Sequence, residues 1–117
     1  DIPDGNTTLQ ATTVRTDYGS VLIGNLPTDH YVIVNVGDLA AQQSARIVFQ
    51  VQIQADATTV RLRNQAQVRY SSDEATGQAQ QVSDDPDTLA GNDETITPLG
   101  NPANQAGARM FLPVITK

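Results

Sequence analysis

Two stretches of period-two alternation constrain the fold of this chain more than any other feature of its sequence. In the first, the alternate positions are apolar, and the residues between them are mostly polar. These apolar residues are Ala45, Ile47, Phe49, Val51 and Ile53. Successive side chains of a β-strand point to opposite faces, so the pattern predicts a strand with one buried and one exposed face.

The second stretch, residues 60–70, repeats the pattern. Its predicted buried residues are Val60, Leu62, Ala66, Val68 and Tyr70. Its predicted exposed residues are Arg61, Arg63, Gln65, Gln67 and Arg69. Asn64 falls on the buried face, where an amide is stable only when hydrogen-bonded, so we expect it to bind the backbone of a neighbouring loop. The exposed arginines either keep the sheet soluble or face an acidic loop of a second copy.

Shorter β-rich runs occupy most of the remaining sequence. The predicted strands are residues 11–16, 20–24, 31–36, 78–83 and 94–97, separated by turn-forming Asn, Pro, Asp and Gly. Residues 39–44 predict one helical turn at most, and no segment has a convincing helical period. The sequence therefore predicts an all-β sandwich in one domain, residues 1–97.

Charge and composition exclude several functions. The 117 residues carry a formal net charge of −6, which disfavours nucleic acids and anionic membranes as partners. There is no cysteine, so disulfides and thiolate metal sites are excluded. No apolar run is long enough to span a membrane. The sole histidine, His30, has no nucleophile motif around it, and we expect the protein not to be an enzyme, with no catalytic residues and no cofactor.

An acidic segment near the end of the predicted sandwich is the one candidate metal site. Its potential oxygen ligands are Asp84, Asp85, Asp87, Asn92 and Asp93. Calcium takes six to eight oxygen ligands, and one loop could supply several of these. The spacing is not that of an EF-hand. Two interpretations stay open, a calcium site and a solvated acidic loop. Asn6–Thr8 is the one N-glycosylation sequon.

The C-terminal segment is strand-like and apolar on both faces. Its apolar residues are Met110, Phe111, Leu112, Val114 and Ile115. A polar stretch without charged residues, Pro98 to Ala106, precedes it. We assign residues 98–109 to the linker and 110–117 to a terminal strand, which needs a groove that shields both faces. The groove belongs to the same chain or to a neighbouring copy; a sorting signal is the third interpretation.

Residues 1–96 resemble the conserved-repeat domain of prokaryotic surface proteins, a domain of unknown function. The resemblance rests on Asp1–Pro3, Val36–Leu39, Ser44–Ile53, Asn64–Val68 and Ser83–Thr88, in that order. It implies an immunoglobulin-like sandwich of about seven strands that serves as an extracellular spacer or adhesive unit. In the family, two further strands open the domain. Here they would precede Asp1, which is consistent with a cleaved precursor or an excised fragment.

Together these features predict a structural subunit of an extracellular filament at the cell surface. Its partners would be other copies of itself, and the C-terminal strand of each subunit would complete the next subunit's sandwich. The alternative is a monomeric spacer or adhesive module of a larger surface protein, with calcium as a candidate ligand.

Overall fold

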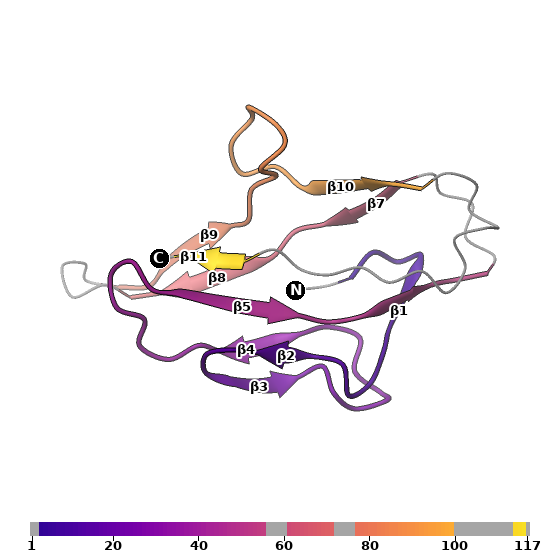
Figure 1. The fold of residues 1–117 in the computed structure, drawn as a ribbon, viewed down its shortest axis with the longest axis horizontal. Helices are drawn as coiled ribbons and strands as arrows, with labels where there is room; N and C mark the ends of the chain where they lie inside the picture. Colours follow the sequence, from indigo (N-terminus) through magenta and orange to yellow (C-terminus); the bar gives the residue numbers. More distant parts are fainter. Residues whose placement is uncertain (1–2, 56–60, 72–76, 100–113, 117) are drawn as a thin grey trace.

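The computed structural model describes residues 3–55, 61–71, 77–99 and 114–116, and these residues form eleven short strands and no helix (Figure 1). The strands are β1 (Thr7–Leu9), β2 (Arg15–Thr16), β3 (Ser20–Ile23), β4 (Ile33–Asn35), β5 (Ser44–Val48), β6 (Val51–Ile53), β7 (Arg61–Asn64), β8 (Gln67–Tyr70), β9 (Ala79–Val82), β10 (Thr95–Pro98) and β11 (Val114–Thr116). The all-β prediction is confirmed, although the strands are shorter and more numerous than expected.

Every ladder is antiparallel, and two chain segments form the framework. The first contains β5 and β6, which pair with β2 and β1 respectively. The second contains β7 and β8, which pair with β10 and β9. β3 and β4 form a hairpin with a register shift between Val21 and Ile23. This hairpin lies beside β2, on the side of β5 that faces away from β7 and β10 (Figure 1).

The alternation of the first stretch is confirmed in full, because all five predicted residues are buried. The strand is nevertheless interrupted at Phe49 and Gln50. Its partner segment bends between β1 and β2, where Thr12 has a φ of 64°. The Gln50 N–H therefore donates to the side chain of Thr13, at 3.1 Å, rather than to a strand backbone.

The second stretch is confirmed in its first half. Leu62, Asn64 and Ala66 are buried, and Val68 is half-buried. The prediction for Tyr70 is wrong, because its side chain is 39% exposed. Tyr70 is the last residue of β8, opposite the small side chain of Ala79, so that position offers little apolar surface to pack against. Val60 lies outside the described residues.

The described core consists of two clusters. The larger one joins the β2–β5 and β3–β4 regions and contains Val14, Val32, Ile47, Phe49 and Val51. The smaller one contains Ile53, Leu62 and Leu99. Gly24, at a φ of 131°, lies against the larger cluster, and a Cβ there would come within 2.8 Å of Val14 Cγ2.

Three local features differ from the sequence prediction. β1 was not predicted, since only Leu9 in it is apolar. The expected helical turn in residues 39–44 is a hydrogen-bonded turn, in which the Gln43 N–H donates to the Ala40 carbonyl at 3.0 Å. Pro98 and Leu99, which we assigned to the linker, belong to β10 and to the smaller core cluster.

Candidate functional site

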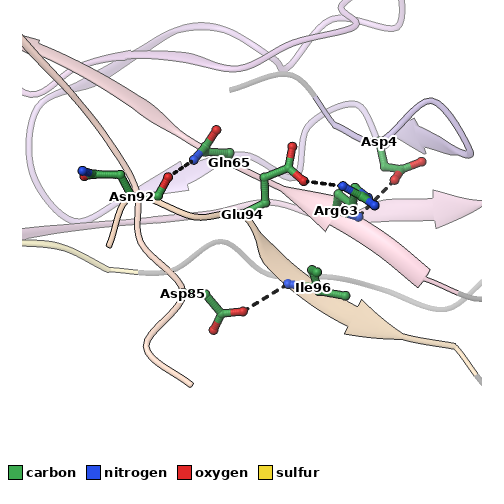
Figure 2. A network of polar contacts seen from close by, with 7 residues as sticks. All are labelled: Asp4, Arg63, Gln65, Asp85, Asn92, Glu94 and Ile96. Carbon is green, nitrogen blue, oxygen red and sulfur yellow. Dashed lines mark hydrogen bonds and ion pairs between the residues drawn. The ribbon is translucent and has the colours of Figure 1, made fainter. Parts of the chain in front are cut away.

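Unpaired strand edges expose backbone groups that can pair with another chain. One such edge is closed by Asp4. Its Oδ2 accepts the Arg63 N–H of β7 at 3.0 Å (Figure 2). Its Oδ1 accepts the Asn6 N–H at 2.9 Å. Burial raises the pKa of Asp4, but these two backbone hydrogen bonds and further contacts outweigh it, so the pKa lies below its ordinary value.

Asp85 closes the opposite edge of the same pair of strands. Its Oδ2 accepts the Ile96 N–H of β10 at 3.3 Å (Figure 2). Its Oδ1 accepts the Asp87 N–H at 3.0 Å. Arg63 and Ile96 are direct cross-strand partners, and both donate their N–H groups to aspartates, so they form a non-hydrogen-bonded pair whose N–H groups face out of the ladder. The two outer edges of the β7–β10 pair thus each carry a carboxylate, and both carboxylates lie at the Arg63–Ile96 position of the ladder.

Side chains also replace strand partners in the other half of the molecule. Asp17 Oδ1 accepts the Arg46 N–H of β5 at 2.7 Å, where β2 has ended. Asn25 bonds both backbone groups of Val14, accepting its N–H at 2.9 Å and donating to its carbonyl at 3.2 Å. These contacts keep the backbone satisfied where the strands are too short to do so.

The other edge of β5 is covered by a strand. β11 pairs antiparallel with β5, with Val114 opposite Arg46, Ile115 opposite Ala45 and Thr116 opposite Ser44. The N–H and the carbonyl of Arg46 both bond Asp17, on the β2 side of β5. Because backbone groups of successive strand residues point to opposite sides, the N–H and carbonyl groups of Ala45 and Ile47 point to the β11 side. β5 is therefore the central strand of a three-stranded sheet in the order β11–β5–β2.

The structure thus pairs the backbone of two of the five predicted interface residues, Val114 and Ile115, with β5 of the same chain. Met110, Phe111 and Leu112 lie outside the described residues, as do linker residues 100–109. The sequence left open whether this segment would pair with its own chain. No sequence signal identified β5 as its partner.

In the acidic loop, residues 83–94, three aspartates accept hydrogen bonds from other residues of the loop. Asp93 accepts the Thr88 hydroxyl at 2.7 Å and the Asp85 N–H at 3.2 Å, and the Thr88 hydrogen bond is the main reason that the pKa of Asp93 lies below its ordinary value. Asp84 accepts the Asp93 N–H at 3.4 Å.

In the parts of the chain that the structure describes, no three His, Cys, Asp or Glu side chains are grouped so as to hold a metal ion. The geometry brings Asp84, Asp85 and Asp93 together through the backbone of the loop, and Asp87 and Asn92 are exposed. A calcium site here stays a prediction of the sequence.

The predicted arginine face is present on β7 and β8. Arg61, Arg63 and Arg69 are exposed, and Arg63 forms an ion pair with Glu94 at 3.0 Å (Figure 2). Next to it, Gln65 donates to the Asn92 carbonyl at 3.0 Å and fastens the acidic loop to the sheet. Asn64 is 6% exposed and lies opposite Thr95.

The remaining singled-out residues have structural surroundings. His30 is exposed, next to Asp29, whose carboxylate accepts the N–H groups of Leu26 and Gly24; these lower the pKa of Asp29. The amide of Asn6, in the sequon, donates to Asp4 at 2.8 Å. The edge-closing role of Asp4, Asp17 and Asp85 was not predicted from the sequence. The one available signal was an aspartate in a turn sequence, Asp4-Gly5 or Asp85-Pro86, which favours a hydrogen bond to the backbone two residues on.

Comparisons with protein-family models, with curated proteins and with solved structures give no match to this chain. Among the described residues there is no helix of the length and apolar character needed to cross a membrane.

Proposed function

We propose that this protein is a structural subunit of an extracellular filament, and that its C-terminal strand completes the sheet of the next subunit. The subunit would be an immunoglobulin-like sandwich at the cell surface, and its partners would be further copies of the same chain. The proposal names no catalytic function and no cofactor.

The observation that supports it is the antiparallel pairing of β11 with β5. β11 consists of three residues, and all three have direct partners on β5. The same backbone hydrogen bonds form when β11 belongs to another copy, so exchange of this strand conserves the pairing. Each subunit that donates β11 forward must accept one from behind, and this head-to-tail contact does not close.

The chain between the sandwich and β11 is long enough for such an exchange. Residues 100–113 separate Leu99 from Val114 and would span roughly 45 Å when extended, at about 3.3 Å per residue. The longest dimension of the molecule is 50 Å. A strand on such a tether can reach either its own β5 or the β5 of an adjacent copy.

The second candidate function is a monomeric spacer or adhesive module of a larger surface protein. It is favoured by the fact that β11 pairs within a single chain, so that one copy closes its own β5 edge. The two functions share the fold and differ in which copy supplies β11.

A truncation tests the proposal. Removing residues 107–117 opens the β5 edge, and we expect the truncated chain to remain monomeric while the full chain forms polymers, as measured by light scattering and negative-stain microscopy. A synthetic peptide of residues 107–117 should then bind the truncated chain at one per subunit. A peptide of the same composition in scrambled order is the matched control. Unchanged polymers after truncation, or equal binding of both peptides, would contradict strand exchange.

A further inference from the structure

The acidic loop, which connects β9 to β10, projects from the molecule (Figure 1, orange). Contacts within the loop and with the sheet keep it ordered. Thr88 donates its hydroxyl to Asp93 at 2.7 Å and its N–H to the Asp85 carbonyl at 3.2 Å. Gln65 fastens the end of the loop through the Asn92 carbonyl at 3.0 Å. A loop ordered in advance loses little conformational entropy when a partner binds it.

This ordered loop presents one apolar side chain among acidic ones. Leu89 is fully exposed, at 108% of its reference area. Asp84 and Asp87 are exposed on the same loop. Single exposed leucines are common on protein surfaces. Here, however, the leucine lies on an ordered loop that projects from the molecule and carries negative charge. Such a loop suits a surface hollow that has some apolar surface and basic side chains on its rim.

A hollow with an arginine on its rim lies where β2 begins and β5 ends, and most of its lining residues are polar. Its volume is about 260 Å³, and it is lined by Thr12, Thr13, Arg15, Val48, Phe49 and Gln50. The half-buried Val48 supplies its exposed apolar surface, because Phe49 is only 2% exposed. The guanidinium of Arg15 is positioned at this hollow by hydrogen bonds to the carbonyls of Thr12 at 2.7 Å and Val14 at 3.0 Å.

The rim of the hollow carries positive charge that is available to a partner. Arg15 also lines an adjoining hollow with Arg46, and the one carboxylate there is that of Asp17. Within the described part of the chain, the ion pair present is Arg63–Glu94, so neither Arg15 nor Arg46 is in an ion pair with another described residue.

The exposed apolar surface of the β3–β4 hairpin is a weaker match. Leu22 is 60% exposed, Leu26 64% and Ile33 42%. Residues 20–35 contain no lysine or arginine, and Asp29 lies among them. An acidic loop gains no favourable electrostatic contact there.

The loop and the hollow lie on opposite sides of the molecule. In Figure 1 the loop is at the top, above β9 and β10, and β2 is in the lower part, beyond β5. One copy therefore cannot bring its own loop to its own hollow without unfolding. Successive copies can make this contact head to tail, and repetition of such a contact gives an open chain of subunits.

We propose that the acidic loop of one copy docks into the Arg15 hollow of the next, with Leu89 against Val48 and Asp87 beside Arg15. The proposal rests on the proposed function, because it assigns a second contact within the same assembly. The partner is a second copy of this chain, and the contact places the exposed Leu89 against Val48, with charges of opposite sign around them.

Charge reversal tests the contact. Asp87→Arg changes the loop, and Arg15→Glu changes the hollow, so each variant alone sets like charges against each other. We expect each to associate roughly tenfold or more weakly than the wild-type chain in sedimentation velocity. An equimolar mixture should recover association, because the altered loop fits the altered hollow and the two unaltered surfaces still fit each other.

Two leucine substitutions, a test and its control, examine the apolar part of the contact. Leu89→Ala should weaken association, whereas Leu22→Ala, at an exposed leucine on the β3–β4 hairpin, should leave it unchanged. Circular dichroism melting confirms that each variant is folded, and Arg46→Glu replaces Arg15→Glu if the latter does not fold.

Three results would overturn the docking proposal: a wild-type chain that stays monomeric at every concentration, variants that assemble as the wild type does, or a mixture that recovers nothing. A loss at Leu22 with none at Leu89 would place the contact on the hairpin and also overturn it. Truncation of residues 107–117 in the same assay separates the two proposals. Failure of docking alone leaves the truncation effect intact, and failure of strand exchange alone leaves the charge-reversal effect intact.

Discussion

The β7–β10 pair and the outer edge of β5 present the same problem, unpaired backbone groups at a sheet edge, and cover it differently. In the β7–β10 pair, Asp4 and Asp85 each accept the N–H group that faces outward. At the outer edge of β5 the cover is β11, a strand that follows the body of the protein by a long stretch of sequence.

The difference separates fixed edges from an exchangeable one. An aspartate side chain can close only the edge beside it, and its charge opposes the approach of a further strand. A strand on a long connection can leave its edge and be replaced by the same strand of another copy. On our account, the protein blocks the edges that must not pair and leaves β5 for assembly.

The largest effect that we expect from breaking a fixed edge is at Asp85, whose side chain is buried and accepts two backbone N–H groups. Asp85→Ala should lower the free energy of unfolding by about 2–3 kcal/mol, since both donors lose a charged acceptor. Urea denaturation measures the change. Asp87→Ala, at an exposed neighbour, is the control and should change stability by less than about 0.5 kcal/mol. Equal effects of the two substitutions would contradict the edge-closing role.

Acid should lower the stability of the fold through three aspartates, one of which closes the β7 edge. The pKa values of Asp4, Asp29 and Asp93 are lowered in the folded protein from an ordinary value of 3.8. Carboxylates with a lowered pKa stabilise the fold above the unfolded-state pKa, and this stabilisation is lost as the pH falls through the folded-state value. The free energy of unfolding should therefore decrease below about pH 4.

Urea denaturation from pH 7 to pH 2 measures this dependence. The double variant Asp29→Asn and Asp93→Asn should show a smaller decrease in this range than the wild type, because two of the linked groups no longer titrate. An identical slope for both proteins would show that these carboxylates do not contribute to the acid sensitivity.

The smallest effect should come from the ion pair beside the Asp4 edge. Arg63 and Glu94 are 3.0 Å apart, but their side chains are 62% and 42% exposed, so solvent screens their attraction. Glu94→Gln should change the free energy of unfolding by less than about 0.5 kcal/mol. A loss of 2 kcal/mol or more, on the order expected for Asp85, would mean that the ion pair and not the backbone contact closes this edge.

The sequence predicted what depends on local periodicity. All five alternate residues from Ala45 to Ile53 are buried, because a strand with one buried face needs only a period of two. The prediction that Tyr70 is buried was wrong, because burial at the end of β8 depends on the residue opposite, which is the small Ala79. Local pattern carries no information about which residue lies opposite.

The closed edges could not be predicted for a related reason. Asp4 and Arg63 are separated by 59 positions, and Asp85 and Ile96 by 11, so each contact depends on how the strands are arranged in space. In the same way, the apolar character of the C-terminal segment predicted that it would pair, but not that β5 would be its partner. The acidic loop was identified from composition, whereas its internal hydrogen bonds emerged only with the structure.

Cysteine cross-linking tests strand exchange most directly, because the chain contains no cysteine of its own. Val114 lies opposite Arg46, and such non-hydrogen-bonded pairs have Cα atoms about 4.5 Å apart, a separation that a disulfide can bridge. A chain with Arg46→Cys is mixed with a chain with Val114→Cys, and the mixture is oxidised. Arg46→Cys mixed with Thr116→Cys, two positions out of register, is the control.

Strand exchange predicts a covalent heterodimer from the first mixture and little or none from the control. When both substitutions are in one chain, it predicts a ladder of covalent multimers on a non-reducing gel. A single monomeric band with an internal disulfide, together with no heterodimer in the mixture, would show that each chain keeps its own β11, and would contradict the proposed assembly.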